Sequence, residues 1–262
     1  MGEKRGQMTI FVIFGILIVF SIVAWFYFSS SNLFTSSDDQ PVIQEITTSA
    51  REFVKECVGL QLEDAIDEIS NRGGYGYDKN PSLTYKFQNI SYLCHTLNYD
   101  ENCVNLEPVL MGSVDTEIES YLSSGVESCF NDLLESYKRY NPVVENTKLD
   151  IIILPGKIIA DIEKNIEITE ESTEIRFNDF SFEIVSPLYV FLDIAIKILN
   201  EEATCDCAEA TCNSDYSDLD TINRGFTVSR FVSNSGDKVY TIKYSRTGDE
   251  FNFAVRNCID NI

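Results

Sequence analysis

The sequence predicts an α+β protein: a single N-terminal transmembrane helix, then an ectodomain of two amphipathic helices and antiparallel sheet with one further helix. Three observations support this class. Residues 8–28 contain no charged side chain. Two later segments carry apolar residues three and four apart, as amphipathic helices do. From Leu149 onward the apolar residues alternate with polar ones, the period of half-buried strands.

These patterns divide the chain into four parts. Residues 1–28 form a cytoplasmic leader and the transmembrane helix, and residues 29–42 form a serine-rich stalk. Residues 43–146 are expected to form a helical, disulfide-stapled subdomain. Residues 147–262 are expected to form an antiparallel sheet subdomain with one helix and a cysteine-rich loop.

The apolar stretch Met8–Phe28 is long enough to cross a bilayer, because its 21 residues would cover roughly 31 Å as a helix. Lys4 and Arg5 precede it, and no basic residue follows before Arg51. The positive-inside rule therefore places the N-terminus in the cytoplasm and the C-terminal bulk outside the cell. A cleaved secretory signal peptide is the alternative, but its apolar region is normally only about 7–15 residues long.

The leader Lys4-Arg5-Gly6-Gln7, followed by about twenty apolar residues, resembles the class III signal peptide of archaeal type IV pilins and pilin-like proteins. The resemblance covers the first 28 residues and implies cleavage between Gly6 and Gln7 by a membrane peptidase. Pilins usually carry a glutamate at the fifth mature position, where this chain has Phe11. The resemblance thus implies a minor pilin-like subunit or a plain anchored protein rather than a major filament subunit.

Two long helices are predicted first in the ectodomain. The first runs from Ile43 to Asn71 and ends before Gly73-Gly74, a pair typical of helix C-termini. The second runs from about Asp115 to Tyr140. Their expected apolar stripes are Ile43, Ile46, Ala50, Phe53, Cys57 and Leu60 in the first, and Ile118, Leu122, Val126, Cys129, Leu133 and Tyr137 in the second.

Strands are predicted between and after these helices. Short ones are expected at 83–87, 90–93 and 151–154, and a long one at 158–169 has Lys164 as the one charged residue on its apolar face. Two more strands, at 174–177 and 180–185, precede a third helix that opens at Ser186-Pro187. The end of the chain is expected to form a meander with strands at 226–232, 238–244 and 251–255.

The composition excludes some functions. The chain has 42 acidic and 20 basic residues, a net charge of −22, and this field repels nucleic acid and anionic lipid. A single histidine, His95, argues against histidine-based metal sites and against Ser-His or Cys-His catalysis. No catalytic motif, cofactor site or metal site is expected. The acidic residues Glu63, Asp64, Asp67 and Glu68 are interpreted as the solvated face of the first helix.

Eight cysteines in an extracellular domain predict four disulfides. Cys57 and Cys129 lie on the stripes of the two long helices, so we expect a bridge between them. Cys94 and Cys103 are close in sequence and form the second expected pair. Cys205, Cys207, Cys212 and Cys258 remain. The first two are too close to bridge each other without strain, so each is paired with Cys212 or Cys258 and the connectivity stays open; zinc held by the four thiolates is the alternative.

The sequence therefore predicts a non-enzymatic, membrane-anchored surface protein with a structural or interaction role. Its expected partners are the membrane and pilin-like or envelope proteins, with no nucleic acid. A surface binding module for a solute or an envelope polymer is the alternative. An extracellular hydrolase or thiol enzyme is less favoured, because only the carboxylates and the cysteine cluster support it. Asn89-Ile90-Ser91 is the single N-glycosylation sequon.

Overall fold

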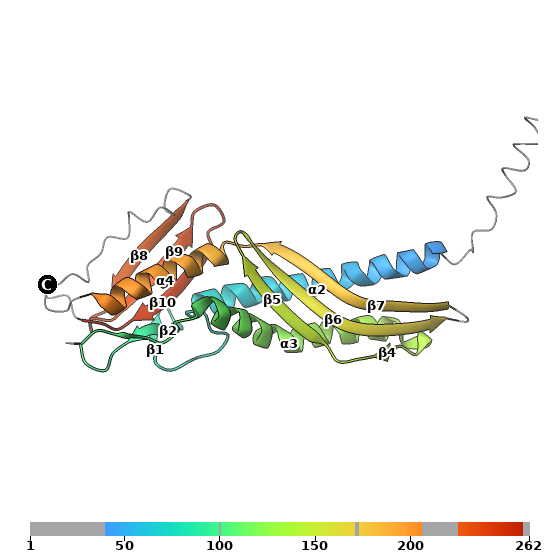
Figure 1. Ribbon diagram of the computed structural model, residues 1–262, viewed down its shortest axis with the longest axis horizontal. Coiled ribbons are helices and arrows are strands. Elements are labelled where there is room, and N and C mark those ends of the chain that lie inside the picture. Colours follow the sequence, from blue (N-terminus) through green and yellow to red (C-terminus); the bar gives the residue numbers. More distant parts are fainter. Residues whose placement is uncertain (1–39, 100, 171–172, 206–224, 259–262) are drawn as a thin grey trace, which may run out of the picture. The chain divides into compact units, whose positions relative to one another are not determined.

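The computed structural model describes residues 40–99, 101–170, 173–205 and 225–258 (Figure 1). The chain divides into two compact units, Met1–Thr48 and Ser49–Ile262. The predicted transmembrane helix, the leader with Gly6 and Gln7, and stalk residues 29–39 lie outside the described residues. Within the described ranges, no helix combines the length and the apolar character needed to cross a bilayer.

The described chain is α+β, as the sequence predicts. It contains the helices α2 (Gln40–Asn71), α3 (Leu110–Ser136) and α4 (Leu188–Thr204), together with a short 3-10 turn, η1 (Lys138–Tyr140). Helix α2 starts three residues before the predicted position, and α3 starts about five residues before its predicted start and ends four before its predicted end. Pro187 occupies the N-cap of α4 rather than its first helical position.

The first sheet has the strand order β1-β2-β10-β9-β8, and β3 also pairs with β2. All its pairings are antiparallel except that of β2 with β10, which is parallel. This pairing joins residues on both sides of the boundary expected near residue 146. The strands are β1 (Ser82–Tyr85), β2 (Gln88–His95), β3 (Val104–Asn105), β8 (Phe226–Val232), β9 (Lys238–Tyr244) and β10 (Glu250–Val255).

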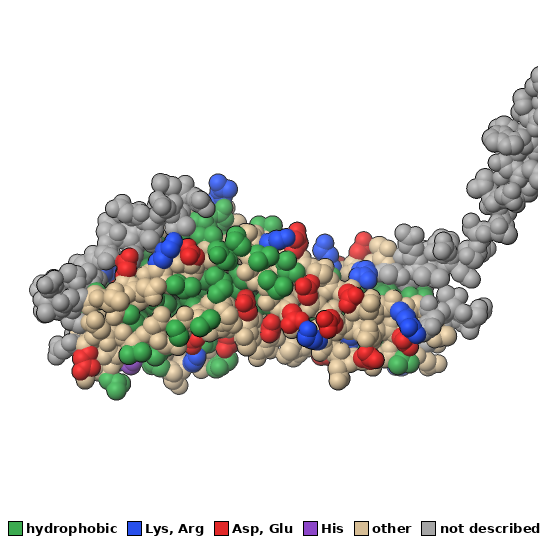
Figure 2. Space-filling view, viewed as in Figure 1, with side chains coloured by type: hydrophobic (Ala, Val, Ile, Leu, Met, Phe, Trp, Pro, Cys, Tyr) green, Lys and Arg blue, Asp and Glu red, His purple; other side chains and the backbone are tan. Residues whose placement is uncertain are grey.

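The second sheet is antiparallel and is built around the long strand β6, which pairs with β4, β5 and β7. Its strands are β4 (Val143–Val144), β5 (Lys148–Leu154), β6 (Lys157–Glu170) and β7 (Thr173–Val185). Three ion pairs cross from strand to strand within the described residues: Lys157–Glu183 at 2.6 Å, Arg176–Glu167 at 3.1 Å and Lys148–Glu163 at 3.6 Å. Figure 2 shows acidic and basic side chains interspersed over the face that includes these strands.

Helices cover both sheets. Helix α3 packs along β5, and α4 packs on β9 and β10 of the first sheet (Figure 1). The apolar face of α4 meets aromatic side chains of the sheet, with the ring of Phe191 5.7 Å from that of Phe226. Tyr240 and Phe253 stack within the same core at 5.3 Å. Burial of these rings supplies much of the hydrophobic stabilisation of this half of the unit.

The apolar stripe predicted for α2 is wrong for two of its residues. Phe53 and Leu60 are 40% and 61% exposed. The buried face repeats mainly every four residues instead: Ala50, Val54, Val58, Leu62, Ala65 and Ile69. Small and β-branched residues make up most of this buried face. A prediction that favours large apolar side chains therefore selects Phe53 and Leu60, which lie on another face of the helix. The stripe predicted for α3 is confirmed from Ile118 to Leu133.

Lys164 is the charged residue on the otherwise apolar face of β6. It is 4% exposed, between Ile162 and Ile166. Its ammonium donates to Thr147 Oγ1 at 2.5 Å and to Glu127 at 3.2 Å. A buried ammonium is tolerated when it is paired and hydrogen-bonded, and these contacts tie β6 to α3.

Two disulfides lie within the described residues, and both were expected. Cys57 of α2 is bonded to Cys129 of α3, with Cα atoms 6.0 Å apart. Cys94 of β2 is bonded to Cys103, with Cα atoms 5.4 Å apart. Disulfides persist in oxidising compartments, so the two bridges indicate an extracytoplasmic location for the domain.

The helix pair packs closely beside its disulfide. The side-chain amide of Gln61 donates to the carbonyl oxygen of Gly125 at 3.4 Å and lies 3.2 Å from Cys129 Sγ. A Cβ atom on Gly125 would lie 1.5 Å from Gln61 Oε1. A side chain at position 125 would therefore displace the end of the Gln61 side chain from its place between α2 and α3.

Acidic side chains of α3 cover the open edge of β5. Glu119 Oε1 accepts the Ile151 N–H at 3.0 Å, and Asp115 accepts the Ile153 N–H. Burial raises the pKa of Asp115, the charge of Glu119 raises it further, and the Ile153 N–H lowers it in part. Asp115 Oδ1 is buried and has no partner among the described residues. The edge is protected from strand addition at the cost of one poorly solvated carboxylate.

We expect removal of the Cys57–Cys129 bridge by a double alanine substitution to lower the free energy of unfolding by about 4 kcal/mol, because its sequence separation of 72 closes a long loop. The Cys94→Ala/Cys103→Ala pair closes a separation of only 9 residues and should cost about 2.7 kcal/mol. Urea unfolding of the full-length chain, followed by circular dichroism, measures both. A larger loss for the shorter loop would contradict this ranking.

Asp115→Asn is expected to stabilise the protein at neutral pH. Because the pKa of Asp115 is raised in the fold, the ionised form is disfavoured. The wild type therefore loses stability as the pH rises from the unfolded-state pKa of about 3.9 through the raised value. The variant has no ionisable group at this position. Its gain in free energy of unfolding over the wild type should therefore vanish near pH 3 and reach its full value at pH 7. Thermal unfolding across this range tests it, with the exposed Asp132→Asn in the same helix as the control.

Candidate functional site: an acidic hollow beside α2

A hollow of about 360 Å³ lies between α2, the corner that joins β7 to α4, and the turn that joins β9 to β10. Its lining combines five carboxylates with apolar side chains. The acidic residues are Glu63, Asp64, Asp67, Asp249 and Glu250. The apolar residues are Ile66, Ile184, Val185, Pro187, Leu188 and Phe191.

Helix α2 contributes one face to the hollow, since Glu63, Asp67 and Ser70 are spaced four and three residues apart. From the sequence, its acidic residues are predicted to form a solvated helix face. Glu63, Asp64 and Asp67 are exposed, as that interpretation requires, but they also line the hollow. Glu68 differs, because it pairs with Arg72 one turn further along the helix.

The opposite wall is the corner between β7 and α4. The Ser186 hydroxyl oxygen accepts the Leu188 N–H at 3.2 Å, which satisfies one of the backbone donors left without a helical partner at the start of α4. Leu188 and Phe191 are only 1% and 2% exposed, so they lie beneath the hollow, and Val185 and Pro187 present the accessible apolar surface of this wall. The stripe that buries α4 against the sheet thus also shapes the hollow.

The turn between β9 and β10 supplies the third wall. Asp249 accepts a hydrogen bond from Thr247 Oγ1 at 2.7 Å, and Glu250 pairs with Lys243 across the two strands at 2.7 Å. Glu63, Asp64, Asp67 and Asp249 make no ion pair with any residue in the described ranges. Lys243 therefore compensates one of five negative charges, and the hollow keeps a strong negative potential.

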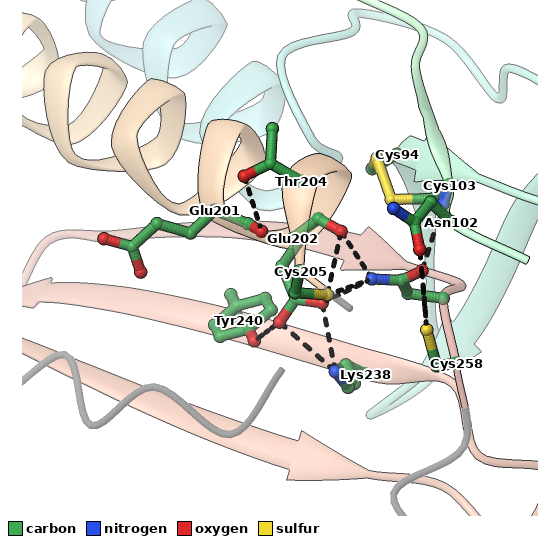
Figure 3. A network of polar contacts seen from close by, with 11 residues as sticks. Cys94, Asn102, Cys103, Glu201, Glu202, Thr204, Cys205, Lys238, Tyr240 and Cys258 are labelled. Atoms are coloured by element: carbon green, nitrogen blue, oxygen red, sulfur yellow. Dashed lines mark hydrogen bonds and ion pairs between the residues drawn. A yellow bond between two sulfur atoms is a disulfide. The ribbon is translucent and has the colours of Figure 1, made fainter. Parts of the chain in front are cut away.

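A second polar cluster lies at the end of α4 and is buried (Figure 3). Glu202 pairs with Lys238 at 3.0 Å, and the two side chains are 0% and 1% exposed. Tyr240 donates its hydroxyl proton to the same carboxylate, and Asn257 Nδ2 lies 3.3 Å from Glu202 Oε2. Asn257 Oδ1 accepts the N–H of Cys103 at 3.0 Å. The cluster is closed to solvent, so its role is to join α4, β9 and the Cys94–Cys103 loop.

This cluster was not predicted from the sequence, although a signal for it was present. Glu202 continues the apolar stripe of α4 three residues after Leu199. Lys238 shares a strand face with Tyr240 and Ile242. Two opposite charges on two apolar faces predict a buried pair, as Lys164 alone predicts a buried cation.

The C-terminal cysteines are placed in part. Cys205 and Cys258 are both disulfide-bonded, so neither is a thiolate ligand for zinc. Cys207 and Cys212 lie outside the described residues, as does the acidic loop around them. The connectivity expected among these four cysteines stays a prediction.

Two other sequence-selected residues have structural surroundings. His95 packs edge-on against Tyr92, with ring centroids 5.0 Å apart, and burial together with the charge of Arg256 lowers its pKa. Arg256 in turn pairs with Asp237 at 2.6 Å. Asn89, the sequon residue, is exposed in β2, and its side chain contacts Thr84 and Asp78.

Comparisons with known proteins provide no relative: no protein-family model, curated protein or solved structure matches the chain.

Lys238→Met should lower the free energy of unfolding by about 3–5 kcal/mol, because Glu202 then remains buried without its ion-pair partner. Lys238→Met/Glu202→Gln should recover part of this loss, since the neutral amide removes the unpaired buried charge and its oxygen can still accept the Tyr240 hydroxyl proton. Urea unfolding of the wild type, both single variants and the double variant gives the coupling energy. A double variant no more stable than Lys238→Met would contradict the pairing as the source of the effect.

Proposed function

We propose that this protein is a single-pass surface protein whose disulfide-stapled head lies outside the cell and has a structural or interaction role rather than an enzymatic one. The observation that carries the proposal is the pair of disulfides, Cys57–Cys129 and Cys94–Cys103. Such bridges suit a head that must persist in an oxidising environment.

The N-terminal sequence supports the anchored form of this proposal. Met8–Phe28 has the length and composition of a bilayer span, and its basic flank is on the N-terminal side. The leader Lys4–Gln7 favours a minor pilin-like subunit, with partners among pilin-like or envelope proteins. Phe11 in place of a glutamate favours single copies or small complexes over long filaments.

A second candidate function is a surface binding module for a solute or an envelope polymer. The acidic hollow favours it, because small ligands bind in concave sites lined by apolar side chains and a few polar groups. This candidate is compatible with the first, since an interaction protein needs a surface that recognises something.

Protease treatment of intact cells that express the full-length chain tests the proposal. We expect release of a soluble head cut within residues 29–42, while an epitope tag fused before Met1 stays protected. Permeabilised cells serve as the control, because the tag must then become accessible. Protection of the head together with cleavage of the tag on intact cells would reverse the orientation and contradict the proposal.

N-terminal sequencing of the membrane-bound protein then separates the two anchored forms. A mature chain that begins at Gln7 supports the pilin-like subunit, and a chain that retains the leader supports the plain anchor.

A further inference from the structure

The β1–β2 hairpin and β8 lie at the same end of the second compact unit, and neither contains an acidic residue (Figure 1). The longer segments 79–99 and 225–236 also contain no aspartate or glutamate, although the whole chain has 42 acidic residues and a net charge of −22. The two segments touch where the ring centroid of Tyr85 lies 5.0 Å from that of Phe231. The negative charge of the chain is therefore concentrated away from this edge of the sheet.

The carboxylates of Asp78 and Asp237 lie beside these segments, but their charges are paired. Asp78 contacts Asn89 of the hairpin and pairs with Arg72 at 3.0 Å. Asp237 follows β8, its side chain is only 1% exposed, and it pairs with Arg256 at 2.6 Å. More distant acidic residues are screened, because the Debye length is about 8 Å at physiological ionic strength. An anionic ligand can therefore approach this edge, although the chain as a whole repels it.

Lys86 and Phe87 form the turn of the hairpin in a conformation that large side chains rarely adopt. The last paired residues are Tyr85 and Gln88, and φ is 49° at Lys86 and 69° at Phe87. Two-residue turns with positive φ at both positions favour Asn and Gly, and a bulky residue there costs stability. The Phe87 side chain is fully exposed, so it gains no packing within the described fold in return. This combination indicates that Phe87 contacts another molecule.

Accessible aromatic surface continues from the turn onto β8. Phe231 and Val232 are 46% and 45% exposed, and Tyr85 is half-buried between them and the turn. The exposed Lys86 ammonium lies 5.0 Å from the centroid of the Tyr85 ring and forms no ion pair with any residue that the structure describes. We call the surface formed by Tyr85, Lys86, Phe87, Phe231 and Val232 the aromatic edge. It combines exposed ring faces with a cation that is available to an anionic group.

We propose that the aromatic edge binds an acidic polysaccharide, with sugar rings packed on Phe87 and Phe231 and a sugar carboxylate beside Lys86. The face of an aromatic ring carries partial negative charge, so it attracts the polarised C–H groups of a sugar ring. A lysine ammonium forms charge-assisted hydrogen bonds with carboxylate oxygens. The inference specifies the envelope polymer of the second candidate function and rests on that role.

A single polymer strand fits this surface better than an anionic bilayer does. A bilayer presents an extended negatively charged plane, so contact with it would also bring the neighbouring acidic surface of the head close to that charge. A thin polymer touches the aromatic edge alone. Duplex DNA is disfavoured for a related reason, because it carries one negative charge per roughly 1.7 Å of its axis.

Isothermal titration of the full-length chain in non-ionic detergent tests the proposal, with oligogalacturonate as the probe and its fully methyl-esterified form as the matched neutral probe. The protein is produced without glycans, because the sequon residue Asn89 lies two positions after Phe87. We expect saturable binding of the acidic probe that weakens as salt is added. The neutral probe should bind about tenfold more weakly, since the charge contact with Lys86 is removed.

Phe87→Gly should weaken binding of the acidic probe by about tenfold, because a stacking contact is lost. The same variant should raise the urea midpoint of unfolding, since glycine adopts a positive φ without steric cost. Lys86→Gln should weaken binding by severalfold and reduce its salt dependence. Leu97→Gly and Lys138→Gln are the matched controls, because both residues are exposed and lie outside the aromatic edge. They should leave the affinity unchanged.

Several results would overturn the proposal. These are the absence of saturable binding, equal affinity for the acidic and neutral probes, and an equal loss in the control variants. A lower urea midpoint for Phe87→Gly would show that Phe87 supports the fold instead. Tighter binding to oligothymidine or to phosphatidylglycerol vesicles would assign the edge to nucleic acid or lipid. Binding is measured on purified protein, so its failure is distinct from a failure of the surface location, which protease treatment of cells tests.

Discussion

The buried charge of Glu202 is the constraint on which much of the first sheet depends. A carboxylate with no solvent access is tolerated only when donors surround it, and here Lys238, Tyr240 and Asn257 come from β9 and from the segment after β10. The same Asn257 also holds the backbone of Cys103. The ion pair and hydrogen bonds of Glu202 therefore hold α4, β9, the segment after β10 and the Cys94–Cys103 loop together.

The sequence was sufficient for the fold class and for most elements, because their signals are local. The meander β8–β10 and the long strand β6 follow from alternation, and the disulfide Cys57–Cys129 follows from two stripes that must pack together. The buried face of α2 was mistaken at Phe53 and Leu60, since small residues carry it. The parallel pairing of β2 with β10 has no local signal, because it depends on how two distant parts of the chain meet.

The candidate site was visible only in part for the same reason. Glu63 and Asp67 were recognised as one helix face, but nothing in α2 indicates that the corner between β7 and α4 and the turn with Asp249 would line the same hollow. The exposed carboxylates of α2 line a hollow only because the tertiary fold brings residues from distant parts of the chain beside them. The disulfides, by contrast, bear on the location and persistence of the domain rather than on recognition.

The parallel pair β2–β10 has a consequence for the order in which the chain acquires its structure. Ala254 aligns with Tyr92, so this contact closes only after nearly the whole chain has been synthesised. Until then the hairpin β1–β2 has an unpaired edge, whereas the Cys94–Cys103 bridge spans only 9 residues and needs no distant partner. The bridge can thus form early, and it then limits the conformations that β2 adopts before β10 pairs with it.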